Sequence, residues 1–355
     1  KGPSGWHRTE VDSQVDGQVT ALAVADADDD CKTELVVGTS VVENVFIYDE
    51  FVFLSLVMLA GTGDMTASWA GGSGLTYEVY YSGQPDTGFT YVADVVASGD
   101  TTEWVDDGTD TGVHPKDVTA RYYRIKLSGT DTFSNTVGKF TRAFGTEMHL
   151  TSIPLVPYSN SIQDVIGTQL TGAPDEAYAD RVWKWDRELQ AFMFAWLVDS
   201  VSPEYNGTWW CPEPFGPSDM TLDFGEGFFV QTRHDNQKVT FVGAVPEGVV
   251  SPVEVRPGMQ LVGTAWPETL VLDSCDFYAS GAKGAADELL ADRVWQWDES
   301  GLFYRYCWLV DGVGPQYDAK WWSSDPWGPS DMRTMPGYGY WYQARGNGFR
   351  WKFWK

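Results

Sequence analysis

Short runs of alternating hydrophobic and polar residues recur along the whole chain of 355 residues. Gly, Asp, Asn and Pro separate these runs at short spacing, a pattern typical of antiparallel strands joined by tight turns. The best candidate for a helix is SIQDVIGTQL, from Ser161 to Leu170, which starts with a residue suited to the N-cap. The pattern therefore predicts an all-β, multidomain chain of β-sandwich or β-barrel-like modules with few short helices. The clearest strand runs are VTALAVA (19–25), TYEVYYS (76–82), FFVQTR (228–233) and YWYQAR (340–345).

The C-terminal half of the chain is a tandem duplication. DRVWKWD begins at Asp180 and DRVWQWD at Asp292, and 292 minus 180 gives an offset of 112. The same offset relates two WLVD segments, two Trp-Trp pairs and two GPSDM segments. A unit of roughly a hundred residues can bury a core of its own, so the two copies are predicted to be domains rather than turns of a solenoid. We name residues 147–243 repeat 1 and residues 259–355 repeat 2.

The remaining sequence divides into three segments. Residues 1–50 form a β segment with an acidic loop, and residues 51–146 contain strand runs sufficient for one sandwich domain. Residues 244–258 (AVPEGVVSPVEVRPG) contain three prolines and short apolar steps. Such a composition indicates an extended, semi-rigid linker between the two repeats.

The charge of the chain limits its partners. Fifty acidic residues against 24 basic ones give a formal charge of −26. A chain so acidic repels nucleic acid and anionic membranes, so neither is an expected partner. The longest apolar run, residues 51–60, is too short to insert across a membrane. The start at Lys1, without an initiator Met, suggests a processed or trimmed mature chain.

Four cysteines in 355 residues do not make a disulfide scaffold. Cys275 and Cys307 lie in repeat 2 and have no counterparts in repeat 1. They either form a disulfide bridge within that repeat or are two buried thiols.

Residues 1–50 resemble one blade unit of the FG-GAP, or integrin-propeller, repeat. The resemblance rests on VTALAVADADDDCKTELVVGTS followed by VFIYD. In that family the loop between the strands has the pattern D-x-D-x-D-G-x-x-D and binds calcium, a hard cation that prefers several oxygen ligands. Here Cys31 replaces the family's glycine, so calcium binding and a solvated acidic turn both stay open. The ligands that the resemblance implies are Asp26, Asp28, Asp30, the Lys32 carbonyl and Glu34.

Residues 51–146 resemble a fibronectin type III domain, through DMTASWAGG, TYEVYYSG, TTEWVDDG and ARYYRIKLSG. That resemblance implies a sandwich but says little about function, because such domains are generic spacers and adhesion modules. The Trp-rich repeats resemble a module found in tandem in large secreted and cell-surface proteins of environmental bacteria. It implies a secreted, extracellular or cell-surface location and no catalytic activity.

Catalytic signatures are missing from the sequence. There is no phosphate-binding loop, and none of the four histidines has a second His or a Cys at zinc spacing. Each copy contains four aspartates at matching positions, but they sit at strand ends and in turns, where a carboxylate caps backbone N–H groups. We therefore expect turn and cap structure from them, and a chain that is not an enzyme. The pairs are Asp180 and Asp292, Asp186 and Asp298, Asp199 and Asp311, and Asp219 and Asp331.

Fifteen of the eighteen tryptophans lie at or after Trp183. Flat indoles can stack on sugar rings. Adjacent residues of a strand point to opposite faces, so one Trp of each Trp-Trp pair can fill the core while the other is exposed. Alternation in DRVWKWD instead predicts Trp183 and Trp185 as core residues. The candidate contacts to a ligand or a second subunit are Trp209, Trp210, Trp321, Trp322, Trp327, Trp351 and Trp354.

These features predict a non-enzymatic extracellular structural protein, such as a self-assembling filament or surface-layer subunit. The lone blade unit, the series of β modules and the lack of a catalytic set favour self-association into an extracellular assembly. The alternative is a carbohydrate-binding adhesin or accessory module, whose exposed tryptophans would bind a glycan.

Overall fold

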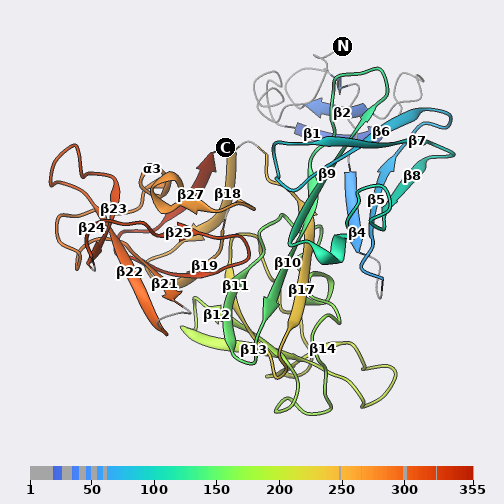
Figure 1. The fold of residues 1–355 in the computed structure, drawn as a ribbon. Helices are drawn as coiled ribbons and strands as arrows, with labels where there is room; N and C mark the ends of the chain where they lie inside the picture. Colours follow the sequence, from blue (N-terminus) through green and yellow to red (C-terminus); the bar gives the residue numbers. More distant parts are fainter. Residues whose placement is uncertain are drawn as a thin grey trace. The chain divides into compact units, whose positions relative to one another are not determined.

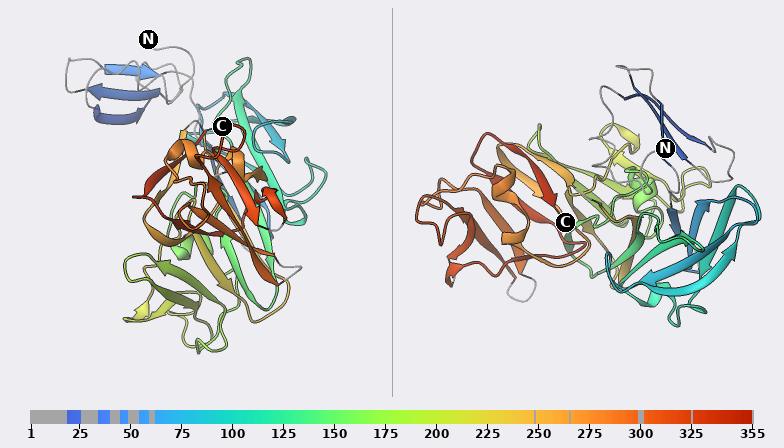
Figure 2. Two further views of the ribbon diagram at one scale, coloured as in Figure 1. Left: turned by 90° about the vertical axis from the view of Figure 1, so that its left-hand side faces the viewer. Right: turned by 90° about the horizontal axis from the view of Figure 1, so that it is seen from above.

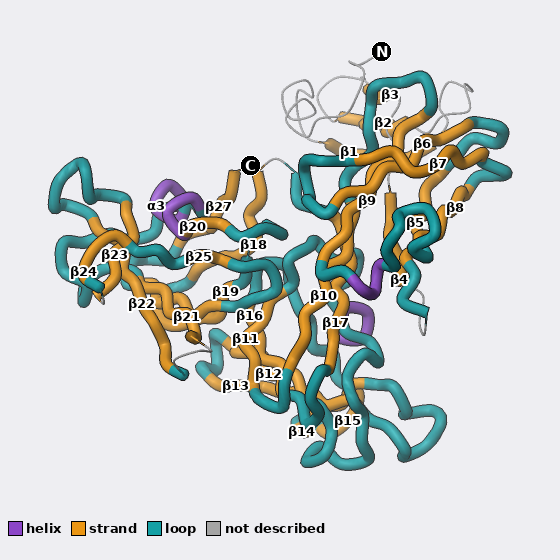
Figure 3. The backbone as a smooth tube through the Cα atoms, in the orientation of Figure 1, coloured by secondary structure: helices purple, strands orange, loops and turns teal. Residues whose placement is uncertain are grey.

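Antiparallel sheets form nearly all the regular structure of the chain (Figure 1), and the helical segments are single turns (Figure 3). The prediction of an all-β chain is confirmed. None of the described helices has the length and hydrophobicity needed to cross a lipid bilayer. The structure, a computed structural model, describes residues 19–25, 34–39, 45–48, 54–58 and 62–354, apart from 248, 265, 299–301 and 325.

The predicted helix from Ser161 to Leu170 is a single turn, α2 (Ile162–Val165). Ser161 caps it as expected, because its side chain accepts a hydrogen bond from the backbone N–H of Gln163. Gly167 follows at φ 58°, a left-handed conformation that ends a helix. The other helical turns are η1 (Pro115–Asp117), η2 (Leu272–Ser274) and α3 (Phe277–Ser280).

The N-terminal segment contains one small antiparallel sheet in the order β1-β2-β3, drawn in blue in Figure 2. The candidate calcium ligands Asp26, Asp28, Asp30 and Lys32 lie outside the described residues. Glu34 is the first residue of β2. The strands are β1 (Val19–Ala25), β2 (Glu34–Thr39) and β3 (Val45–Tyr48).

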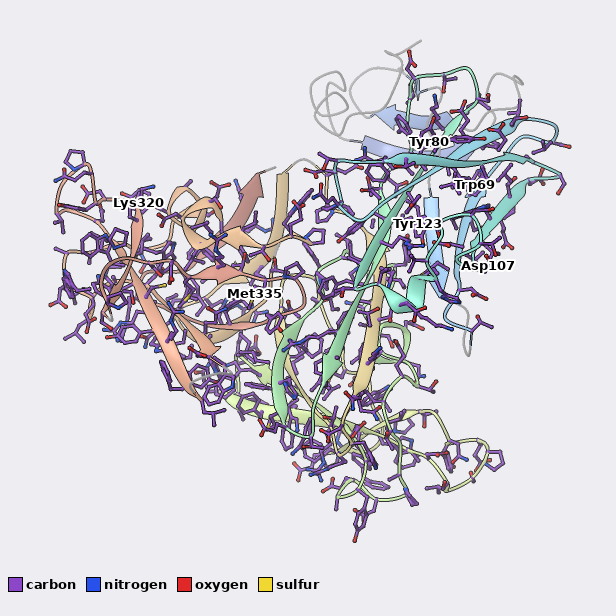
Figure 4. All side chains as sticks on the ribbon, viewed as in Figure 1. Trp69, Tyr80, Asp107, Tyr123, Lys320 and Met335 are labelled. Atoms are coloured by element: carbon purple, nitrogen blue, oxygen red, sulfur yellow. The ribbon has the colours of Figure 1, made fainter. Side chains whose placement is uncertain are left out.

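The chain divides into two compact units, Lys1–Lys139 with Val242–Gly248, and Phe140–Phe241 with Val249–Lys355. The first unit contains a sheet of order β4-β5-β8 and the strands β7-β6-β9, which are neighbours in a five-stranded sheet. Trp69 of β5 and Tyr123 of β9, both labelled in Figure 4, belong to the buried core of this unit. The strands are β4 (Leu54–Met58), β5 (Met65–Ala70), β6 (Thr76–Ser82), β7 (Thr90–Val96), β8 (Thr101–Asp106) and β9 (Ala120–Leu127).

The two repeats have the same strand order. Repeat 1 forms a six-stranded sheet of order β11-β16-β12-β13-β14-β15, and repeat 2 one of order β19-β26-β21-β22-β23-β24. The strands of the first sheet are β11 (Met148–Ser152), β12 (Arg181–Asp186), β13 (Ala191–Leu197), β14 (Trp209–Pro212), β15 (Phe215–Pro217) and β16 (Gly227–Gln231). Those of the second are β19 (Gly258–Val262), β21 (Arg293–Asp298), β22 (Phe303–Val310), β23 (Lys320–Ser324), β24 (Trp327–Pro329) and β26 (Tyr340–Ala344).

The segment expected to be a free linker is largely a strand of the second repeat's fold. β18 (Val249–Val255) is extended, as predicted, but it pairs with the last strand, β27 (Phe349–Trp354). Val253 and Val255 are buried, so the apolar steps of the segment contribute to a core instead of facing solvent. In the same way β10 (Val137–Phe144) lies next to β17 (Gln237–Ala244), the last strand of repeat 1. Two short strands, β20 (Leu270–Val271) and β25 (Arg333–Thr334), complete repeat 2.

Repeats 1 and 2 adjoin in both views of Figure 2, and their backbones meet through matching contacts. The N–H of Ser152 donates to the carbonyl of Gly337 at 3.2 Å. Its counterpart, the N–H of Gly263, donates to the carbonyl of Gly225 at 2.7 Å. Ser152 of repeat 1 contacts Gly337 of repeat 2, and their counterparts Gly263 and Gly225 make the same contact with the repeats exchanged. Reciprocal contacts of this kind join the subunits of a twofold symmetric dimer, and here they join two repeats of one chain.

Glycines make this close approach of the two backbones feasible. A Cβ added to Gly263 would lie 2.4 Å from the Cβ of Ser152. At Gly227 it would lie 2.9 Å from a backbone oxygen of repeat 2, and at the counterpart Gly339 2.7 Å from a backbone oxygen of repeat 1. The contact between the repeats therefore explains why Gly227 and its counterpart Gly339 are both glycine.

Candidate functional site

The two faces of each six-stranded sheet differ in composition. In β12, Val182 is buried in the core of repeat 1. Trp183 and Trp185 alternate with it, so they lie on the opposite face, where both are half-buried. The expectation that these tryptophans fill the core is wrong, because Val182 takes the core side. We call the face that carries Trp183 the outer face.

The Trp-Trp pairs divide between the two faces, as the sequence predicts. Trp209 is 2% exposed, belongs to the core of repeat 1 and donates its indole N–H to the carbonyl of Gly167 at 2.9 Å. Trp210, its neighbour, is half-buried and packs with the outer-face residues. In repeat 2, Trp321 is buried and Trp322 packs on the outer face. Trp209 and Trp321 are therefore no longer candidates for contact with a ligand or a second subunit.

Trp351, one of the candidate contacts to a ligand or a second subunit, is not available for such a contact. Its ring is buried and stacks on Phe277 with 4.3 Å between ring centroids, and its indole N–H donates to the carbonyl of Cys275 at 2.6 Å. Trp351 is inside because β27 pairs with β18, which places this residue in the core of repeat 2. The backbone of Trp354 ends β27 opposite Val249.

Six aromatic rings follow one another on the outer face of each repeat, and we call each series an aromatic row. The two rows have aromatic residues at the same six positions, in the same order, at the offset of 112. In repeat 1 the rings are Tyr205, Trp210, Phe215, Trp196, Phe194 and Trp183, with successive centroid separations of 5.2, 5.2, 6.1, 6.3 and 4.4 Å. In repeat 2 they are Tyr317, Trp322, Trp327, Trp308, Tyr306 and Trp295, at 5.3, 6.0, 5.3, 6.5 and 6.1 Å.

Exposure varies strongly along each row. The third ring is the most exposed, at 74% for Phe215 in β15 and 72% for Trp327 in β24. The ring beneath it, Trp196 or Trp308, is buried. Each row therefore presents one projecting aromatic ring on a base of packed rings.

Polar groups accompany the rings. The buried indole N–H groups of Trp196 and Trp308 have no hydrogen-bond partner in the structure. Arg181 lies over the ring of Phe194, 5.0 Å from its centroid, and Arg293 over the ring of Tyr306 at 5.4 Å.

The arginines of the rows are paired with acidic residues. Arg181 is 3.7 Å from a carboxylate oxygen of Glu176, and Arg293 is 3.6 Å from one of Glu288. A flat aromatic base edged with N–H donors and a carboxylate can bind a ring that is apolar on its face and carries hydroxyls at its edge.

The first pair of shared aspartates has the capping role expected from the sequence. Asp180 is buried and accepts hydrogen bonds from the backbone N–H groups of Thr171 at 2.7 Å and Arg233 at 2.6 Å. Asp292 accepts two equivalent backbone N–H groups at 2.9 and 2.5 Å. Burial raises the pKa of Asp180, while these backbone hydrogen bonds act in the opposite direction.

Cys275 and Cys307 are two buried free thiols, not a bridge. They have different neighbours, since the sulfur of Cys275 lies 3.7 Å from the hydroxyl of Thr334 and that of Cys307 lies 3.6 Å from the sulfur of Met332. Of the two arrangements left open by the sequence, the structure has the second.

Within the described ranges, no three His, Cys, Asp or Glu side chains are grouped so as to hold a metal ion. The candidate calcium loop lies outside those ranges, so calcium binding there stays a prediction. Comparisons with protein-family models, with curated proteins and with solved structures found no match.

As candidate contacts, the sequence named only Trp210 of the first row, and Trp322 and Trp327 of the second. It missed Phe215 and also Tyr205 and Tyr317, which begin the rows. The available signal was the offset of 112, which pairs Tyr205 with Tyr317 and Phe215 with Trp327.

Proposed function

We propose that this chain is a non-enzymatic protein of the extracellular space or cell surface, and that it binds carbohydrate polymers through its two aromatic rows. The observation that supports the proposal most is the row itself. Aromatic rings recur at the same six positions in both repeats, and the third ring of each row is about three-quarters exposed. Stable packing alone would favour covering so large an apolar ring, so its exposure in both copies favours contact with a ligand.

The chemistry of the rows suits sugars. A pyranose has an apolar face that stacks on an aromatic ring and hydroxyls that accept from N–H groups and donate to carboxylates. Phe215 and Trp327 supply the stacking surface. Two rows in one chain would also raise the apparent affinity for a polymer that reaches both, because the second contact is then intramolecular.

Cosedimentation with insoluble polysaccharides tests this proposal. Cellulose, xylan, chitin and mannan are each mixed with the wild type and with a Phe215→Ala, Trp327→Ala double variant. We expect at least one polymer to retain the wild type and not the double variant. Tyr278→Ala is the matched control, because Tyr278 is an aromatic residue, 41% exposed, on α3 of repeat 2 and is not a member of either row. Failure of all four polymers to retain the wild type, or equal retention of the double variant, would overturn the proposal.

Self-association, the first expectation from the sequence, is a second proposal supported by one strand. Among the described strands β7 is at the edge of its sheet, and its residues Tyr91 and Val96 are exposed. An exposed edge with apolar residues can pair with a strand of another chain. Sedimentation velocity over a range of concentrations tests this. We expect reversible association that Val96→Lys abolishes, whereas a monomer at every concentration would contradict it.

A further inference from the structure

Repeat 2 contains a pocket of about 380 Å³, next to Met335, which Figure 4 labels. Gln296 and Arg305, which are cross-strand neighbours on β21 and β22, contribute to its lining. Gln296 alternates with Trp295 of the aromatic row, so it lies on the opposite face of the sheet. Trp297, which shares the face of Trp295, also contributes to the lining, but none of the six rings of the row does. The pocket and the row are therefore different sites.

The equivalent position in repeat 1 is filled. Lys184, the counterpart of Gln296, extends its ammonium group to a carboxylate oxygen of Glu226 at 2.8 Å and to the carbonyl of Thr221 at 2.8 Å. Glu226 is itself the counterpart of Tyr338, which lines the pocket in repeat 2. Gln296 and Tyr338 thus stand in repeat 2 at the positions that this ion pair occupies in repeat 1.

The lining of the pocket favours a neutral ligand. Arg305 and Arg333 balance Asp298 and Asp331, and the guanidinium of Arg305 is already 2.6 Å from a carboxylate oxygen of Asp331. The formal charges of the lining therefore cancel, and an ionic ligand would leave one charge uncompensated. The pocket still has both donors and acceptors to offer, and hydroxyl groups can use both.

We propose that this pocket binds one sugar ring of a neutral glycan. Its volume is within the range of small-ligand sites, about 300–1,000 Å³. The ring of Tyr338 supplies the apolar wall, while Gln296 and Asp331 supply a donor and an acceptor for hydroxyls. The class of ligand, a carbohydrate, rests on the proposed function, but the surface is a different one. Each chain would then have one pocket for a single sugar ring in addition to two rows for a polymer.

The test uses neutral disaccharides, which are short enough for one of their rings to enter the pocket. Cellobiose, xylobiose, mannobiose and diacetylchitobiose are titrated into the full chain by isothermal calorimetry. A Gln296→Lys, Tyr338→Glu variant transfers the residues of repeat 1 into repeat 2 and should fill the pocket. We expect at least one disaccharide to bind the wild type, and to bind the filled variant roughly tenfold or more weakly. Tyr278→Ala, at an exposed aromatic residue of α3 outside both the pocket and the rows, is the control and should bind within about twofold of the wild type.

Asp331→Asn is the second pocket variant, because the Asp331 side chain is largely exposed and its replacement leaves the core intact. It should weaken binding in the same direction as the filled variant. Disaccharide binding unchanged in both pocket variants would overturn the pocket. A wild type that binds none of the disaccharides but is retained by a polysaccharide would overturn the pocket and leave the rows. A wild type that binds neither would overturn both proposals.

Discussion

The assignment of Trp209 and Trp210 to opposite faces of one sheet can be tested by replacing each with Ala. Trp209 is 2% exposed in the core of repeat 1. A buried Trp covers roughly 150–250 Å². At about 25 cal/mol per Å² its removal costs about 4–6 kcal/mol. Loss of the hydrogen bond to the Gly167 carbonyl adds about 1 kcal/mol.

Replacing Trp210 by Ala should lower the free energy of unfolding much less. Its ring is half-buried, and its indole N–H donates to the hydroxyl of Thr208 at 3.0 Å. Its edge contacts with Tyr205 and Phe215 are worth about 0.5–1.5 kcal/mol each, so Trp210→Ala should cost about 1–3 kcal/mol.

Urea denaturation followed by circular dichroism measures both effects as shifts of the unfolding midpoint. We expect the shift for Trp209→Ala to be at least twice that for Trp210→Ala. The larger shift in Trp210→Ala, or equal shifts, would refute the assignment of faces and with it the outer face on which the proposed function rests.

Three further predictions concern stability and thiol chemistry. Gly263→Ala should lower the free energy of unfolding by about 1–3 kcal/mol, because the added Cβ would overlap that of Ser152 in the contact between the repeats. In the double variant, Ser152→Gly should recover part of this loss. Changes in unfolding free energy that simply add in the double variant would contradict the contact. Burial raises the pKa of Asp180, so its stabilising contribution is present below its ordinary pKa and is lost as the pH rises through the raised value. The unfolding free energy of the wild type relative to Asp180→Asn should therefore increase from pH 7 towards about pH 4, and a decrease would be inconsistent with this burial. Burial raises the pKa of Cys275 to about 12 and also raises the pKa of Cys307. A maleimide, which reacts with the thiolate, should therefore label both cysteines only in urea. A disulfide between them, detected by mass spectrometry, would contradict the two free thiols.

The all-β class, the main strand runs and the duplication follow from the sequence because they depend on patterns that can be read along the chain. The order of the strands within each sheet was not predicted, because it depends on pairing between distant segments. The face of each tryptophan does not follow from the sequence either. Alternation shows that Trp183 and Trp185 share a face, but only packing against the rest of the repeat decides whether that face or the face of Val182 is the covered one. Burial of Trp351 depends in the same way on the pairing of β27 with β18, a contact between residues far apart in the chain.

The site itself was only partly predictable. Trp210 and Trp327 were among the expected contacts, yet their two rows also contain Phe194 and Phe215 in repeat 1 and Tyr306 in repeat 2. These rings come from different strands and meet only after the sheet has formed. The reciprocal contact between the repeats could not be predicted either, because a duplicated sequence implies two copies of a surface but does not show that the two copies contact each other.

Binding isotherms on the polysaccharide that retains the wild type test the central claim most directly. Four proteins are compared, namely the wild type, Phe215→Ala, Trp327→Ala and the double variant. If the rows bind the polymer, each single variant should be weakened and the double variant should lose roughly tenfold or more in affinity. Four superimposable isotherms would contradict the account, because the most exposed ring of each row would then have no part in binding.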